Sequence, residues 1–190
     1  GCQNHSCGGL VQTSDEEGVT VFRNLFIDNK TRNFKVKGLN QFVNNVIYNW
    51  TGEGAYGAQG GSYNIINNYY KPGPVNAAKK THCRIFTAYV DDGKNQQAKG
   101  VYGKFYVNGN YFETYDKLSA SQKTEAANAN ADNTSSTAFV VKNNEISSQN
   151  LLVSSRFPIL DDYSFVQTAQ NAYKAILQYA GASNIRDNID

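Results

Sequence analysis

The sequence lacks methionine altogether and contains only three prolines among its 190 residues. Charge is also scarce, because Asp, Glu, Lys and Arg make up 18% of the residues and the formal net charge is +2. So small a net charge excludes nucleic-acid binding as a property of the whole chain. Any electrostatic function must therefore rest on local clusters of charged residues. No stretch is long and apolar enough to span a membrane. The first residues also lack the charged, apolar and small-residue segments of a signal peptide.

The few cysteines and histidines define neither a disulfide framework nor a metal site. Cys2, Cys7 and Cys83 cannot all pair within one chain, and a Cys2–Cys7 disulfide is compatible with the spacing without being required by it. His5 and His82 lie near cysteines, but no second pair of ligands completes a tetrahedral zinc set. We therefore interpret these residues as structural.

The abundant residues favour β structure. Asn, Gly and Tyr are frequent at the expense of Leu and Glu, a bias typical of short strands joined by turns. With 40% apolar residues, the chain can bury the core of a single domain over residues 1–190. Because the chain begins with Gly, we expect a processed product or a fragment.

Four short apolar or aromatic runs are each interrupted by asparagine and then resume. The asparagine before the second half of each run is Asn24, Asn45, Asn68 or Asn110, with spacings of 21, 23 and 42 residues. Because 42 is twice 21, we expect a degenerate repeat near Ala88–Tyr89, within a further strand-like run. A constant period of this length is typical of a solenoid.

This period predicts five stacked coils with an asparagine at each bend. Asparagine suits a bend because it tolerates a left-handed backbone and forms local hydrogen bonds. Stacking aligns equivalent side chains, so the asparagines are expected to form an amide ladder around an apolar interior. The alternative is an antiparallel β-sandwich in which asparagine marks hairpin turns, although hairpins do not require a constant phase.

The pattern fades toward the carboxyl end. Residues 117–150, rich in Ser, Thr, Asn, Ala and Gln, are interpreted as a polar surface excursion with a candidate strand at 138–142. A C-terminal helix is predicted over 164–180, because Ser164 and Gln167 fit a capping box. Its apolar face comprises Val166, Ala169, Tyr173, Ile176, Leu177 and Ala180. We expect this helix to pack on the outside or the end of the solenoid.

The sharpest local feature is the basic segment Lys30–Lys37, which reads Lys-Thr-Arg-Asn-Phe-Lys-Val-Lys. In an extended backbone, Lys35 and Lys37 project to one face while Phe34 and Val36 project to the other. The alternation predicts a cationic surface anchored by buried apolar side chains. The alternative is a solvated basic face without further function, as most charge runs are.

Several motifs occur in order along the chain. They are Asn24–Phe26, Thr31–Gly38, Phe42–Trp50, Asn67–Pro74, Tyr179–Ser183 and Arg186–Asp187. Together they resemble the pectate lyases of polysaccharide lyase family 1, and specifically the C-terminal portion of a bacterial member. The resemblance implies an all-β, right-handed parallel β-helix with a C-terminal amphipathic helix. It also implies a secreted, periplasmic or cell-surface enzyme that cleaves polygalacturonate by β-elimination with calcium.

The resemblance also implies roles for the basic segment. Arg32 shares the parity of the core-facing residues, is therefore expected in the bend before the strand, and corresponds to the proposed Brønsted base of the family. Lys37 corresponds to the cation that holds the substrate carboxylate, Lys35 adds positive potential, and Lys30 is a further substrate-binding candidate. Phe34 stands where the family usually carries Pro, which can alter the bend that presents Arg32.

The chemistry of β-elimination explains why cations belong in such a site. Removal of the C5 proton beside a uronate carboxylate builds negative charge on that carboxylate, and fixed cations stabilise this charge more in the transition state than in the ground state. An arginine base must first lose its own proton, so nearby cations are expected to lower its pKa. In this family calcium also acidifies the substrate, and calcium needs several oxygen ligands.

Carboxylates are not clustered near the basic segment. Asp15, Glu16 and Glu17 precede the first clear strand and are interpreted as a solvated turn. The resemblance places the calcium ligands mostly outside this chain, on N-terminal coils that the chain lacks together with their cap. We therefore expect an exposed first coil, or a second chain that supplies the missing coils.

Two other classes of function stay open at the level of sequence. One is a noncatalytic polyuronate-binding β-helix, and the other is a structural surface or filament protein built on the same solenoid. Tyr48, Trp50 and Tyr56 could stack on sugar rings beside the basic segment, or they could be ordinary packing residues.

Overall fold

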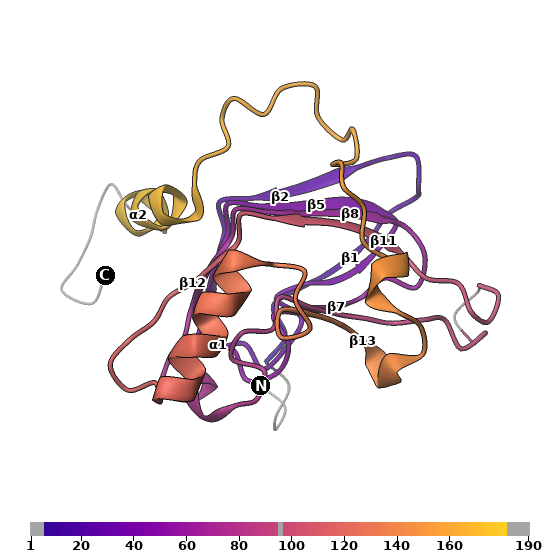
Figure 1. Cartoon of the computed structure of the whole chain (residues 1–190). Coiled ribbons are helices and arrows are strands. Elements are labelled where there is room, and N and C mark those ends of the chain that lie inside the picture. Colours follow the sequence, from indigo (N-terminus) through magenta and orange to yellow (C-terminus); the bar gives the residue numbers. More distant parts are fainter. Residues whose placement is uncertain (1–5, 95–96, 182–190) are drawn as a thin grey trace.

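The computed structural model describes residues 6–94 and 97–181, whose strands stack into a parallel β-helix (Figure 1). All strand pairings in its three sheets are parallel. Four successive coils each contribute one strand to each sheet, and β13 begins a fifth coil. The parallel solenoid expected from the sequence is confirmed.

The sheets are built from short strands. The first sheet contains β1 (Leu10–Gln12), β4 (Lys35–Lys37), β7 (Ala55–Gly57), β10 (Phe86–Ala88) and β13 (Phe139–Val141). The second contains β2 (Val19–Phe22), β5 (Leu39–Val43), β8 (Ser62–Ile66) and β11 (Lys104–Asn108). The third contains β3 (Leu25–Ile27), β6 (Val46–Tyr48), β9 (Tyr69–Lys71) and β12 (Tyr111–Phe112). The helices are α1 (Ala120–Ala131) and α2 (Ala169–Tyr179), with short 3-10 turns at Asn76–Ala78, Lys142–Asn144 and Ser148–Asn150.

Some sequence features lie outside the described residues. They include the Cys2–Cys7 pairing, His5 and the closing motifs from Ala182 onward. Within the described ranges, no helix combines the length and apolar character that crossing a membrane requires.

A buried ladder of asparagines joins the coils at the bend between the second and third sheets. The backbone N–H of Asn45 donates to Asn68 Oδ1 at 2.9 Å, and that of Asn68 donates to Asn110 Oδ1 at 3.0 Å. Asn24 begins the ladder by donating its N–H to Asn45 Oδ1. Because buried amides are costly when unpaired, this repeated pairing fixes the phase of the coils.

The left-handed backbone at this bend lies one residue before each rung of the ladder. Asn44, Asn67 and Gly109 take φ values of 52°, 51° and 69°. The side chains of Asn44 and Asn67 point away from the ladder and each donates to the carbonyl oxygen of Gln167 at 2.8 Å. These bonds hold the segment that leads into α2 against the solenoid.

The prediction of a degenerate repeat near Ala88–Tyr89 is wrong. Asn68 bonds directly to Asn110, so one coil connects two rungs that are 42 residues apart. β10, which occupies the expected position, belongs to the first sheet and not to a bend. The extra length lies in the connections on either side of β10. A doubled spacing does not distinguish two coils from one coil with long connections.

The segment 117–150, interpreted from the sequence as a polar excursion, contains α1 and β13. The side chain of Ser119 caps α1 by accepting a hydrogen bond from the backbone N–H of Gln122. The Gln122 side chain accepts a hydrogen bond from the backbone N–H of Ser119 in turn. Of the α1 residues, Ala126 and Ala129 are buried. A helix whose buried face is alanine carries little apolar periodicity, which is why the composition suggests a loop. The candidate strand at 138–142 corresponds to β13.

α1 covers the edge of the third sheet, alongside β12 (Figure 1). Asn130 accepts from the N–H of Phe112 at 2.7 Å and donates to the Phe112 carbonyl at 3.0 Å. Asn133, directly after the helix, accepts from the N–H of Asn110 at 2.7 Å and so extends the ladder by a fifth rung. The helix thereby satisfies backbone groups of β12 that an open sheet edge would expose.

The C-terminal helix α2 packs on the outside of the third sheet, one of the two positions expected. Tyr173 stacks on Tyr69 of β9, with ring centroids 4.3 Å apart. The helix begins later than the predicted range 164–180, because Thr168 is the N-cap. The Ser164 hydroxyl donates to Asp162, so the capping box suggested at Ser164 does not form.

Candidate functional site

The basic segment lies on the outer face of the first sheet, as its alternation predicts. Phe34 is buried against Phe26 and Phe42, with ring centroids 5.1 and 4.8 Å away. Lys35 and Lys37, with the opposite parity, line a hollow on the outside of the sheet. The core aromatic residues therefore anchor the strand that presents the two lysines.

Arg32 precedes this strand in a left-handed conformation with φ of 56°, in the expected bend. Its Nε donates to the Tyr56 hydroxyl at 2.9 Å. Tyr56 lies on β7, where the register pairs it with Lys35. This hydrogen bond from Arg32 to Tyr56 raises the pKa of Arg32 above its ordinary value. The expectation that neighbouring cations lower this pKa is therefore not met, because Tyr56 favours the charged form of the guanidinium.

Two hollows adjoin the pair formed by Lys35 and Tyr56. The hollow lined by Lys35, about 330 Å³ in volume, also contains Gln12, Lys37, Gln59, Asp91 and Lys94. The hollow lined by Tyr56, about 270 Å³ in volume, also contains Lys30, Thr51, Glu53 and Tyr89. The structure thus groups Lys35 with Lys37 and places Lys30 in a separate hollow.

The three aromatic residues considered for sugar stacking lie in different surroundings. Trp50 is completely buried and donates its Nε1 to the Thr81 carbonyl at 3.2 Å, so it is a packing residue. Tyr48 belongs to β6 in the third sheet, whereas the basic segment contributes to the first. Tyr56 lies beside the lysines, and its ring centroid is 5.3 Å from that of Tyr89. Of the three, Tyr56 is the candidate sugar platform.

The sequence interpretation missed Tyr89, Asp91 and Lys142. These residues lie far from the basic segment along the chain, and β10 and β13 bring them to the same sheet. The run of strand-forming residues around Tyr89 was a signal for a strand, but it gave no information on which sheet the strand joins.

The described residues do not fit calcium. No group of three or more His, Cys, Asp or Glu side chains comes together within residues 6–94 and 97–181. Asp91 is 2% exposed and its Oδ1 accepts from the Gly93 N–H at 2.7 Å, while Oδ2 has no hydrogen-bond partner in this part of the chain. One carboxylate in a hollow with Lys35, Lys37 and Lys94 lacks the several oxygen ligands that calcium needs.

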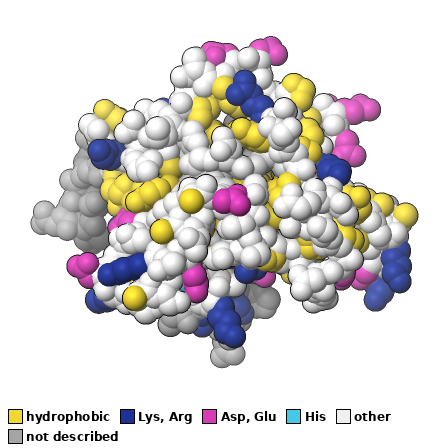
Figure 2. All heavy atoms as spheres, viewed as in Figure 1, with side chains coloured by type: hydrophobic (Ala, Val, Ile, Leu, Met, Phe, Trp, Pro, Cys, Tyr) yellow, Lys and Arg dark blue, Asp and Glu magenta, His cyan; other side chains and the backbone are white. Residues whose placement is uncertain are grey.

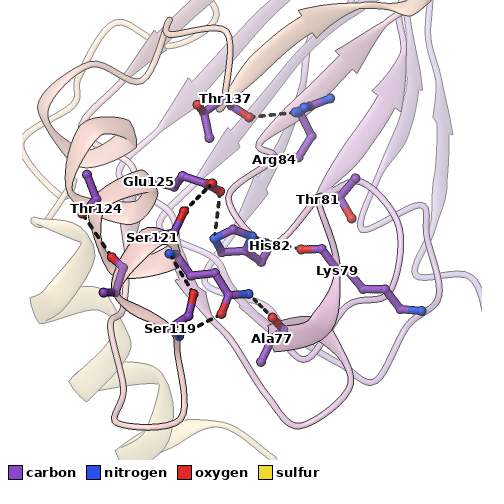
Figure 3. A network of polar contacts seen from close by, with 12 residues as sticks. Ala77, Lys79, Thr81, His82, Arg84, Ser119, Ser121, Thr124, Glu125 and Thr137 are labelled. Carbon is purple, nitrogen blue, oxygen red and sulfur yellow. Dashed lines mark hydrogen bonds and ion pairs between the residues drawn. The ribbon is translucent and has the colours of Figure 1, made fainter.

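A second polar cluster lies between α1 and the connection from β9 to β10 (Figure 3). His82 is 2% exposed, with Nδ1 3.0 Å from the Lys79 carbonyl oxygen and Nε2 3.4 Å from Glu125 Oε2. The Ser121 hydroxyl donates to Glu125 and is not the partner of the histidine. Burial raises the pKa of the adjacent Cys83 thiol to about 12, which keeps it a thiol at neutral pH. The cluster fastens α1 to the solenoid and forms no nucleophile–base pair.

The fold and the site together define a class of protein. Lys and Arg side chains are scattered among Asp and Glu side chains on the face shown in Figure 2. On the first sheet, by contrast, Lys35 and Lys37 share one hollow beside two tyrosines. The chain is a parallel β-helix protein whose candidate site is a cationic hollow on the outer face of the first sheet.

Comparison with known proteins finds several relatives that share one name. The chain is 37% identical over 197 residues to a protein named probable pectate lyase C from Aspergillus flavus. Proteins of the same name from Neosartorya fischeri and Aspergillus terreus are 37% identical over 198 residues and 38% identical over 197 residues. Each alignment covers 100% of this chain. Over its whole length the chain is therefore similar to proteins named probable pectate lyase C.

The chain corresponds to only part of each relative, because it spans 38% of the length of these three proteins. No protein-family model matches the sequence. The three relatives are fungal, so they give no support to the bacterial origin suggested by the motifs.

Proposed function

We propose that this chain carries the cationic half of a site that cleaves polygalacturonate by β-elimination. The observation that carries the proposal is the convergence of Arg32, Lys35 and Tyr56 on the outer face of the first sheet, with Lys37 in the adjoining hollow. The names of the relatives, probable pectate lyase C, support a pectate-cleaving lyase.

In the proposed reaction, Lys37 pairs with the carboxylate of one galacturonate residue and Lys35 adds positive potential. The C5–H bond breaks, its proton passes to Arg32 in the neutral form, and the electron pair forms the C4–C5 double bond. The C4–O bond breaks, and the leaving oxygen takes a proton from solvent. The two ammonium groups stabilise the charge that develops at the carboxylate. Lys30, in the neighbouring hollow, binds another part of the polymer.

Tyr56 sets a condition on this role of Arg32. While the hydroxyl accepts from Nε, the pKa of Arg32 is raised and the side chain acts as a cation. Base catalysis therefore requires substrate to displace Tyr56 from the guanidinium. Arg84 has a pKa lowered by burial, but its Nε donates to the Thr137 carbonyl at 2.8 Å and the residue lines neither of the two hollows beside Lys35 and Tyr56.

Calcium and secretion belong to the proposal through the family resemblance. The calcium ligands would come mostly from outside the described residues, and the chemistry assigned to Arg32, Lys35 and Lys37 passes through no metal. Secretion to the periplasm, the cell surface or the medium is inferred from the substrate, since a long polysaccharide must be met outside the cell.

A noncatalytic polyuronate-binding β-helix is the second candidate function. The raised pKa of Arg32 favours it, because a protonated arginine holds carboxylates and abstracts no proton. Both candidates require Lys35 and Lys37 to contact the polymer, and they differ in whether the polymer is cleaved.

The test is the ultraviolet absorbance of the unsaturated product when polygalacturonate and calcium are mixed with the intact assembly, in which the coils that carry the calcium ligands are present. Arg32→Ala is expected to lower the rate by about 10²–10⁴-fold, the usual contribution of a general base. Arg23→Ala is the matched control, because Arg23 also lies at a bend with positive φ but borders the second and third sheets. An Arg32→Ala variant that cleaves at the wild-type rate would place the base elsewhere. Absence of product despite binding would establish the second candidate.

A further inference from the structure

The outer face of the first sheet has a second cationic end, apart from the basic segment. Lys142 directly follows β13, and its Nζ lies 4.3 Å from the centroid of the Tyr89 ring. The Tyr89 ring in turn neighbours that of Tyr56, 5.3 Å away. On the far side, Lys35 Nζ lies 5.8 Å from the Tyr56 ring. The order across the sheet is therefore lysine, tyrosine, tyrosine, lysine.

The register of the sheet places these four residues on or next to four neighbouring strands, with Tyr89 and Lys142 shifted by two residues along the strand direction. Tyr56 on β7 is aligned with Thr87 on β10, and Thr87 with Val140 on β13. Tyr89 and Lys142 each lie two residues further on, which keeps them on the same outer face. Neighbouring strands are about 4.8 Å apart, so the three steps from β4 to β13 cover about 14 Å. The two lysines thus mark the ends of an extended row.

Both members of the second end are held by rigid neighbours. The backbone N–H of Tyr89 donates to the Gly57 carbonyl at 2.7 Å. Phe139 and Val141 of β13 are buried in the core, with exposed fractions of 0% and 5%. The side chain of Lys142 is exposed at the start of a short 3-10 turn. The backbone is fixed while the ammonium group stays accessible.

The contacts between the lysines and the rings are easily exchanged for a ligand. The attraction between a cation and an aromatic face is weak at an exposed site. A hydrogen bond between an ammonium group and a carboxylate is stronger. An acidic sugar can therefore draw each lysine away from its ring and leave the ring face free to contact the sugar.

We propose that Tyr89 and Lys142 form a second subsite for an acidic sugar residue, three strands away from the subsite of Lys35 and Lys37. The rings of Tyr56 and Tyr89 contact the sugar rings that lie between the two subsites. Lys142 pairs with a carboxylate further along the polymer. This inference rests on the proposed binding of polyuronate by the basic segment. It adds a preference for substrates long enough to cover four strands.

The test compares the binding of galacturonate dimers and hexamers by titration calorimetry. Lys142→Gln removes the charge and is expected to weaken hexamer binding about tenfold, as for one lost charged hydrogen bond, and to leave dimer binding at Lys35 and Lys37 unchanged. Lys123→Gln, the same change on the exposed surface of α1, is expected to alter neither affinity. Tyr89→Leu is expected to weaken the hexamer selectively as well.

The result that overturns the inference is a Lys142→Gln variant with wild-type hexamer affinity. An equal loss for dimer and hexamer also overturns it, because it would show a general charge effect. Lys37→Gln, measured in parallel, separates this failure from a failure of the proposed function. If Lys37→Gln weakens both oligomers and Lys142→Gln weakens neither, the extended row is wrong. If Lys37→Gln weakens neither oligomer, the polyuronate site of the basic segment is wrong.

Discussion

The asparagine ladder and the outer face of the first sheet arise from the same stacking of coils but use polar side chains in opposite ways. Asn45 and Asn68 are completely buried, and their amides bond to the coils on both sides. Lys35 and Lys37 face an open hollow. In the ladder an unmade hydrogen bond costs stability, whereas on the sheet an exposed charge costs little and remains available to a ligand. The groups that stabilise the stack and the lysines proposed to bind a ligand therefore lie on different sides of the solenoid.

The strongest test of this comparison breaks the ladder at its centre. Asn68 accepts from the N–H and Nδ2 of Asn45 and donates to Phe42 and Asn110. Asn68→Ala is expected to lower the free energy of unfolding by about 3 kcal/mol, since each buried group left unpaired costs about 1–3 kcal/mol. Urea denaturation gives this value. Asn24→Ala, at the exposed first rung, serves as the control and is expected to cost less than 1 kcal/mol, roughly a surface effect. Equal losses would show that burial is not the cause.

Lys37→Ala tests the opposite side of the coil. The rate constant kcat/KM on polygalacturonate is expected to fall about 100-fold, the loss typical of removing one group that stabilises developing charge. The free energy of unfolding is expected to change by less than about 0.5 kcal/mol, as for other surface positions. Lys94→Ala, in the same hollow but outside the sheet, should lower kcat/KM far less. A large loss of stability in Lys37→Ala would contradict the separation.

Tyr56→Phe sharpens the role of Arg32 within the cationic face. Removing the hydroxyl removes the interaction that raises the Arg32 pKa, so the pKa falls toward its ordinary value. At any pH below that pKa, a larger fraction of Arg32 is neutral, and the alkaline rise of a base-catalysed rate shifts to lower pH. A pH–rate profile measures the shift. Tyr89→Phe is the control, and an unshifted profile in Tyr56→Phe would identify Arg32 as a fixed cation.

The smallest effect is expected at the cap of α1. Ser119→Ala removes the bond to the Gln122 N–H and should destabilise the protein by about 1 kcal/mol, the usual loss at an N-cap. The comparison is with Ser121→Ala, whose exposed hydroxyl makes a long bond of 3.4 Å to Glu125. Thermal denaturation of the two variants distinguishes them. If both melt like the wild type, the edge of β12 does not depend on how well α1 is capped.

Regular stacking explains which parts of the fold could be predicted. The spacing of Asn24, Asn45 and Asn68 gave the phase of three coils, because each rung must meet the next. The alternation in β4 gave the buried and outward faces, since a strand between two neighbours leaves two directions for its side chains. α1 was missed although Ser119 and Gln122 form a capping box, because its polar composition and alanine face lack an apolar stripe.

By itself, the sequence determined a parallel solenoid with buried asparagine rungs and a cationic segment from Arg32 to Lys37. Both depend on local rules: side chains alternate along a strand, and a repeated period aligns equivalent residues. The tertiary structure decided that Arg32 bonds to Tyr56, that Lys30 is separated from Lys37, and that Lys142 joins the same face. Those contacts join residues from different coils. Their positions depend on the lengths of the connections between strands, which the repeat does not specify.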